Sequence, residues 1–202
     1  MDPQQQNQYP IDYLNQIAPQ PPKQGLSSKL FFLIIGGGVL LAIIVGFLLL
    51  NPGSGGPKEK MQTLAARMIT LQEVASDSQK NIKSGSLRAT NSNLTIFLTN
   101  ANRDIAEPLL NNDIDVKGLD KAIVTKEDGT ELKEKLEDAR LNAVFDRTYA
   151  QEMTYQLDTI AVLMGDIYER TNSKSLKDFL LKTDSDLQPI KKALNEFSDA
   201  NT

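Results

Sequence analysis

Residues 130–171 read TELKEKLEDARLNAVFDRTYAQEMTYQLDTIAVLMGDIYERT, and apolar side chains recur along them at alternating spacings of four and three residues. This spacing places the apolar side chains on one face of an α-helix and repeats every seven residues, as in the seam of a helical bundle. The seam extends over about five heptads, with Asp146 as its polar member. Its members are Leu132, Leu136, Ala139, Ala143, Asp146, Ala150, Met153, Leu157, Ile160, Met164 and Ile167. We therefore predict one long helix over 130–171.

Amphipathic segments also lie on both sides of this stretch. We predict helices over 58–83 and 87–111, separated by a Ser-Gly-Ser turn, and a last helix that begins near Ser173. Residues 112–129 form a connection into the long helix. Strand patterns are absent from the sequence. Four amphipathic helices with short connections predict an all-α protein with an antiparallel four-helix bundle, and a long coiled coil is the structural alternative.

Two prolines fall within the predicted helices. Pro108 should kink or shorten the second helix near its end, because proline lacks the N–H group that a helix interior requires. Pro189, together with the polar stretch 183–186, implies a kink or a restart in the last helix.

Residues 30–50 read LFFLIIGGGVLLAIIVGFLLL and carry no charged side chain. As a helix, this segment would span about 30 Å, the thickness of the hydrocarbon core of a bilayer. A buried core helix would carry a polar face, and a cleaved signal peptide would have a shorter apolar region before a cleavage site of small residues. We therefore predict an uncleaved signal-anchor that crosses the membrane once.

The remaining boundaries follow from composition. Residues 1–29 are rich in Gln and Pro and poor in apolar side chains, so we predict a disordered tail. Residues 51–57 read NPGSGGP and should be a flexible linker. The bundle domain should then occupy residues 58–202.

The orientation of the membrane segment is predicted from its flanks. Lys23 and Lys29 precede it, whereas Lys58, Lys60 and Arg67 follow it, so the two sides carry similar positive charge. Lys29 directly adjoins the apolar segment, and long domains behind a first apolar segment are usually translocated. We expect the N-terminus in the cytoplasm and the bundle domain outside the cell membrane.

Gly38, Ala42 and Gly46 recur at four-residue spacing within the membrane segment. Small residues at this spacing lie on one helix face and allow two transmembrane helices to approach closely. They form a candidate transmembrane packing face, and simple lipid exposure of the same residues is the alternative.

The chain contains no cysteine and no histidine. Disulfides, thiolate chemistry, Ser-His-Asp triads and His-ligated metals are therefore excluded. The net charge of −4 is mild, and no basic stripe with interleaved aromatic residues occurs, so nucleic acid is not an expected partner. We predict no catalytic, cofactor-binding or metal-binding residues.

The stretch LNAVFDRTYAQEM at 141–153 resembles a family of exported bacterial proteins of unknown function, whose members carry Phe-Asp-Arg-x-Tyr followed four residues later by Met. The segment LKDFLLKT at 176–183 is similar to the part of the same family that precedes its last helix. The resemblance implies a ferritin-like four-helix bundle. Family members commonly carry histidines where this chain has Leu157 and Ile190, so the resemblance implies the fold and not a metal activity.

Asp146, Arg147 and Tyr149 form a candidate polar group in the core. A buried carboxylate must be paired or hydrogen-bonded, and we expect Asp146 to contact Arg103, Arg147 or Tyr149, or to lie partly exposed at a kink. A catalytic or metal-binding carboxylate is the alternative interpretation.

These observations favour a non-enzymatic binding or scaffolding module of the cell envelope, anchored in the membrane. Its expected partners are the lipid bilayer and either another envelope protein or a second copy of the chain. The alternative is a sensor in which the bundle acts on the cytoplasmic tail through the transmembrane helix. A ferritin-like metal-binding protein is a third and weaker hypothesis, because the histidines are missing.

Overall fold

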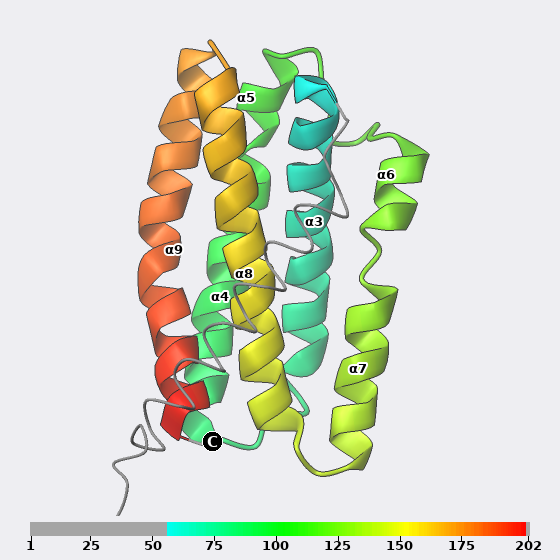
Figure 1. Cartoon of the computed structure of the whole chain (residues 1–202), viewed down its shortest axis with the longest axis vertical. Coiled ribbons are helices and arrows are strands. Elements are labelled where there is room, and N and C mark those ends of the chain that lie inside the picture. The colour runs from blue at the N-terminus through cyan, green and yellow to red at the C-terminus, as the bar shows by residue number, and fades with distance from the viewer. Residues whose placement is uncertain (1–55, 201–202) are drawn as a thin grey trace, which may run out of the picture. The chain divides into compact units, whose positions relative to one another are not determined.

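A computed structural model of the chain describes residues 56–200, and this part is all-helical (Figure 1). Its helices are α3 (Pro57–Ser78), α4 (Gly85–Asp104), α5 (Ala106–Leu110), α6 (Lys121–Lys126), α7 (Thr130–Leu141), α8 (Phe145–Arg170) and α9 (Lys174–Ala200). None of the helices in 56–200 is long and apolar enough to cross a membrane. The predicted tail 1–29 and the predicted membrane segment 30–50, with Gly38, Ala42 and Gly46, lie outside the described residues.

Four long helices surround a common core, so the predicted all-α bundle is confirmed. α3 packs against α4 and α8, and α9 packs against the same two helices from the other side. Figure 1 shows that each of these four long helices runs antiparallel to the long helices it packs against. α4 and α8 therefore run in the same direction, and residues 105–144 must return the chain from one end of the bundle to the other.

Apolar side chains from all four long helices fill the core. Each fully buried Leu or Met contributes about 1.5–3 kcal/mol relative to an exposed position. The largest side chains with almost no exposed surface are Leu64, Met68, Leu71, Ile82, Leu87, Leu94, Leu98, Ile105, Leu109, Tyr149, Met153 and Leu157. The core is thus continuous along the bundle.

The ends of α4 follow from its sequence. The Ser84 hydroxyl accepts a hydrogen bond from the Leu87 N–H at 3.4 Å and caps the first turn. At the other end, Pro108 cannot donate to the carbonyl of Asp104, and its ring crowds that carbonyl. α4 ends at Asp104 and α5 starts at Ala106, so the predicted effect of Pro108 is confirmed.

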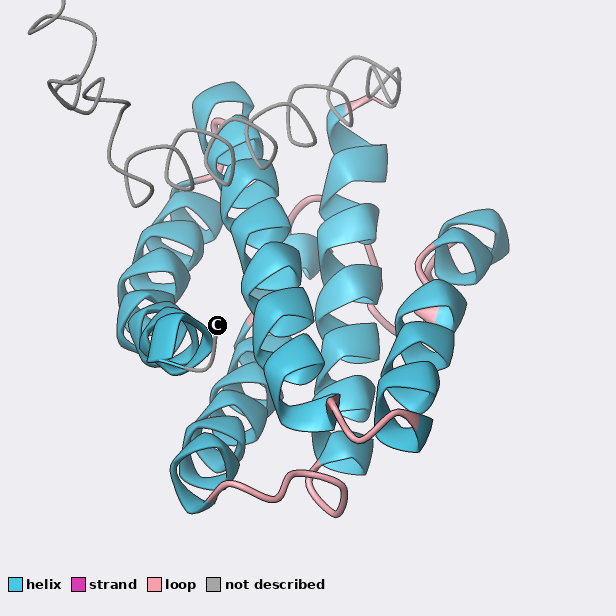
Figure 2. Cartoon of the chain, turned by 60° about the horizontal axis from the view of Figure 1, so that its bottom comes forward, coloured by secondary structure: helices cyan, strands magenta, loops and turns pink. Residues whose placement is uncertain are grey.

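The prediction of one long helix over 130–171 is wrong. α7 ends at Leu141, and the chain reverses over residues 142–144 before α8 starts. Ala143 adopts the left-handed conformation with φ +59°, and the Val144 N–H donates to the Ala139 carbonyl at 2.9 Å, which closes the end of α7. α7 consequently packs beside α8 as an additional helix (Figure 2).

The apolar pattern did not reveal this reversal because each half of the seam is buried in its own helix. Two seam members at the reversal depart from the pattern: Ala143 is exposed and Asp146 is half-buried. The other members are buried as expected. Periodicity therefore placed the buried face correctly and missed the turn.

Two other predicted boundaries need correction. The first helix ends at Ser78 rather than at residue 83, because the chain turns at 79–81 to enter α4. The last helix begins at Lys174, as expected, but it continues through residues 183–186 and Pro189 without a restart. Pro189 and Ser185 are exposed, so water can bond to the Ser185 carbonyl that lacks a helical donor.

Candidate functional site

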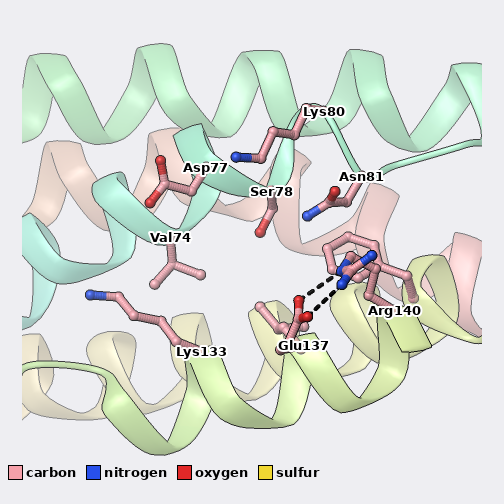
Figure 3. Close-up of a pocket in the computed structure, with 10 residues that line it drawn as sticks. Val74, Asp77, Ser78, Lys80, Asn81, Lys133, Glu137 and Arg140 are labelled. Atoms are coloured by element: carbon pink, nitrogen blue, oxygen red, sulfur yellow. Dashed lines mark hydrogen bonds and ion pairs between the residues drawn. The ribbon is translucent and has the colours of Figure 1, made fainter. Parts of the chain in front are cut away.

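A groove of about 540 Å³ lies between the C-terminal part of α3, the turn that follows it, and α7 (Figure 3). Its volume is within the range of small-molecule binding sites. The residues that line it are Val74, Asp77, Ser78, Lys80, Asn81, Lys133, Leu136, Glu137, Arg140 and Phe145.

The apolar part of the groove is provided by Val74, Leu136 and Phe145, which are buried members of the core. Ser78 is also buried, with 5% of its surface exposed. An apolar surface with a few polar groups around it is the usual composition of a ligand site.

On the α7 side, Arg140 donates two hydrogen bonds to the carboxylate of Glu137, at 2.7 and 2.5 Å. These hydrogen bonds lower the pKa of Glu137 and raise that of Arg140. Both groups are therefore charged and paired with each other, so this wall of the groove leaves neither charge without a partner.

On the α3 side, the polar side chains are unpaired. Within residues 56–200, the side chains of Asp77, Ser78, Lys80 and Asn81 form no hydrogen bond or ion pair. They present one carboxylate, one hydroxyl, one ammonium and one amide along a single helical end and turn (Figure 3). A ligand in the groove would meet donors and acceptors that no protein group occupies.

α7 is held in place by polar contacts that the α6–α7 connection and α7 itself make with α3 and α8. Arg67 pairs with Glu127 at 2.7 Å, and the Thr70 hydroxyl donates to the Glu127 carbonyl at 2.5 Å. Lys135 of α7 pairs with Glu152 of α8. These contacts fix α7 beside α3 and so define the width of the groove.

Gly129 is the residue that turns the chain into α7. Its φ of +71° is left-handed, and an added Cβ would lie 2.6 Å from Thr70 Cγ2. The left-handed φ and the close approach of Thr70 both favour glycine, which has no Cβ, at this position.

Asp146 does not take part in a buried side-chain group. Its carboxylate accepts hydrogen bonds from the backbone N–H of Lys83 at 2.9 Å and of Ser84 at 2.7 Å. The expected contact with Arg103, Arg147 or Tyr149 is not formed, whereas the alternative of a partly exposed site is confirmed, because Asp146 is half-buried in the first turn of α8, next to the α3–α4 turn. Arg147 is exposed.

Tyr149 does lie in the core and belongs to a polar network. Its hydroxyl donates to Asn91 Oδ1, and Asn91 Nδ2 donates to the Ala75 carbonyl at 2.9 Å and to Gln79 Oε1 at 2.5 Å. Burial raises the pKa of Tyr149 above its ordinary value, so its hydroxyl remains a donor. The network joins α8 and α4 to the end of α3.

A second asparagine of α4 repeats this geometry. Asn102 Nδ2 donates to the Met68 carbonyl at 3.2 Å and to Gln72 Oε1 at 2.6 Å. In both cases one amide bridges an α3 carbonyl and the Gln four residues further along the chain. We call these two arrangements, centred on Asn91 and Asn102, the amide clamps.

Sequence reasoning missed Asn91, although a signal for it was present. Asn91 falls between Leu87 and Leu94 on the apolar stripe of the second helix, at the spacing that buries a side chain. A polar residue on such a stripe predicts a buried hydrogen-bonded amide, as it does in many bundle cores.

No group of three or more carboxylates among residues 56–200 is placed to hold a metal ion. Leu157 and Ile190, which stand where the resembled family carries histidine, are buried core residues. The chain matches no protein-family model, no curated protein and no solved structure at a significant level.

Proposed function

We propose that the chain is a single-pass membrane protein whose helical bundle is a non-enzymatic binding module on the outer face of the cell membrane. The observation that carries this proposal is the groove between α3 and α7, where four unpaired polar side chains border an apolar surface. The apolar segment 30–50 supplies the proposed membrane anchor.

Binding without catalysis is favoured by the chemistry of the groove. Ser78 is its one hydroxyl side chain, and no base hydrogen-bonds to it within the described part of the chain. Nucleophilic catalysis by serine requires such a base within hydrogen-bond reach. Histidine and cysteine, which supply most nucleophile and base pairs, do not occur in the sequence. The proposal involves no cofactor.

The proposed fold within the all-α class is the ferritin-like four-helix bundle. It is supported by the parallel direction of α4 and α8 and by the long crossover over residues 105–144, since ferritin-like bundles contain one long crossover. The likeness to exported bacterial proteins at 141–153 is compatible with this topology. A partner for such a module is another envelope component or a second copy of the chain.

The topology part of the proposal can be tested by cysteine labelling, because the natural chain has no cysteine. Lys80→Cys should react with a membrane-impermeant maleimide in intact cells, because it lies in the bundle domain. Asn7→Cys should react only after lysis, because it lies in the predicted cytoplasmic tail. If position 7 were labelled in intact cells and position 80 were not, the bundle would lie in the cytoplasm, and this result would contradict the proposal.

The binding part can be tested with a photoreactive amino acid placed at position 80 of the full chain in intact cells. We expect a crosslinked adduct at this position and none at Gln188, an exposed residue of α9 used as the matched control. Asn81→Ala combined with Asp77→Ala should abolish the adduct without unfolding the bundle, since Asp77 is exposed and neither side chain has a partner within 56–200. Equal crosslinking at positions 80 and 188, or at neither, would contradict a specific groove ligand.

A further inference from the structure

The reversal between α7 and α8 is short and strained. It consists of residues 142–144, and Ala143 adopts φ +59°, a conformation that L-residues with a Cβ atom disfavour. Non-glycine residues with positive φ are uncommon, and Asn and Asp are several-fold enriched among them. The chain carries an alanine at this position instead of a glycine or asparagine that would relieve the strain.

The sequence of the reversal is also compatible with an uninterrupted helix. The spacing of four and three residues continues through it without a phase shift, from Ala139 to Ala143, Asp146 and Ala150. Residues 130–171 contain no proline. Two backbone conformations, a reversal and a straight helix, are therefore consistent with the same heptad pattern.

A straight helix is incompatible with a single closed bundle. α7 and α8 lie antiparallel, so straightening residues 142–144 would withdraw α8 and α9 from α3 and α4. This would separate the bundle into two halves, α3 through α7 and the pair α8 and α9. The buried faces of both halves would then be exposed, unless an identical α8–α9 pair replaced the one that was withdrawn. A second copy of the chain carries that identical pair.

We infer that residues 142–144 are a hinge through which two copies of the chain exchange α8 and α9. In the exchanged dimer, α3 and α4 of one copy pack against α8 and α9 of the other, and each copy has one straight helix from α7 through α8. Every core contact between the halves re-forms between copies, so the exchange changes only the hinge and the surface next to it. Short strained hinges favour this kind of exchange.

Two exposed apolar residues lie at the hinge: Leu141 directly precedes it, and Val144 is its last residue. Leu141 is 67% exposed and Val144 is 49% exposed in the closed bundle. In a straight helix they are three residues apart and lie on one face. Two such helices from the two copies would pass each other at the hinge, and this strip would become buried between them.

Exchange can be detected in the full chain by zero-length carbodiimide crosslinking, which couples amines to carboxylates that are in contact. Lys60 Nζ of α3 lies 2.5 Å from Asp166 Oδ2 of α8, so this link joins the two halves across the hinge. Lys191 Nζ of α9 lies 2.5 Å from Asp158 Oδ1 of α8, and this control link stays within one half. The dimer fraction of the detergent-solubilised chain is separated by size, crosslinked and resolved on a denaturing gel.

If exchange occurs, the Lys60–Asp166 link converts the dimer into a covalent dimer, whereas the Lys191–Asp158 link is found within single chains. Lys60→Met combined with Lys135→Met should then remove the covalent dimer, because the Lys135–Glu152 pair also joins α7 to α8 across the hinge. A dimer that associates through the membrane segment would carry the Lys60–Asp166 link within single chains, and this result would overturn exchange without affecting the proposed binding function.

Variants of the hinge provide an independent measurement. Ala143→Val should raise the ratio of dimer to monomer at least about tenfold, because a β-branched residue tolerates positive φ poorly but is accepted in a helix. Ala143→Gly should lower the ratio by about tenfold, because glycine relieves the strain and disfavours the straight helix. Ala143 is exposed, so neither change alters the core. The same substitutions at Ala89, an exposed position within α4, should leave the ratio unchanged, and a ratio insensitive to both changes at residue 143 would refute the hinge.

Discussion

Asp146 connects the first turn of α8 to the backbone of the α3–α4 turn. Its carboxylate accepts from two consecutive N–H groups, of Lys83 and Ser84. It also lies at a helix N-terminus, where the partial positive charge of the backbone favours an anion. The residue therefore positions the turn that forms one end of the groove.

We predict that Asp146→Ala lowers the free energy of unfolding by about 1 kcal/mol, because hydrogen bonds to a charged group are lost at a half-buried site. Arg147→Ala is the matched control, since the neighbouring exposed side chain should change stability by less than about 0.5 kcal/mol. Urea titration of both variants measures the difference, and equal stabilities would show that the Asp146 bonds contribute nothing net.

Tyr149 makes the stability of the fold sensitive to alkaline pH. Burial holds the pKa of its hydroxyl above the ordinary value of 10.0, which the unfolded chain retains. The unfolded state therefore releases this proton first. The contribution of Tyr149 to stability is fully present below about pH 10 and is lost as the pH rises from there towards the raised pKa.

For Tyr149→Phe we expect a loss of about 1–3 kcal/mol at neutral pH, because Asn91 Oδ1 stays buried without its donor. Above about pH 10, the stability of the natural chain should fall more steeply than that of the variant, by up to about 1.4 kcal/mol per pH unit. Urea titrations at several pH values give both quantities. Parallel pH profiles for the two proteins would mean that Tyr149 ionises as readily when folded as when unfolded.

Among the elements, α7 is less firmly packed than the helices of the core. It buries three residues, Leu132, Leu136 and Ala139, whereas α8 buries eight. The groove also separates part of α7 from α3. Local opening requires little free energy where few apolar contacts are broken.

Hydrogen exchange should therefore show the amides of α7 exchanging well before those of α8 at neutral pH. Gly129→Ala should widen this difference, because the new Cβ meets Thr70 and the residue keeps a left-handed φ, at a cost of about 1–2 kcal/mol. Gly165→Ala in α8 is the matched control, because nothing lies within 4 Å of its added Cβ. Protection of α7 that equals that of α8 would show that the two helices open only together.

At the scale of the whole molecule, periodicity predicted the helical class and the faces that become buried. Leu157, Ile160 and Met164 are buried as their spacing requires. Spacing does not encode the direction of the chain between buried faces, and the reversal at Ala143 depends on one backbone torsion that alanine rarely adopts.

The groove could not be predicted from the sequence, because it too depends on how the chain folds back between helices. Its two sides come from segments separated by more than fifty residues, Val74–Asn81 and Lys133–Arg140, and neither segment contains a recognisable motif. The side chains on the α3 side are ordinary exposed polar residues when read along the chain. Only the position of α7, which was predicted as part of a longer helix, brings the two sides together.

The amide clamps have a consequence for how α3 and α4 are aligned lengthwise. If α4 slid along α3 by one helical turn, about 5.4 Å, its leucines would still meet apolar side chains. Asn91, which is buried, and Asn102, which is half-buried, would instead lose their carbonyl and Gln acceptors at the same time, and amides removed from water without partners are costly. Apolar packing thus drives the two helices together, whereas the amides select one longitudinal register. Because the Tyr149 hydroxyl of α8 donates to Asn91, the same hydrogen bonds also fix the position of α8 along α4.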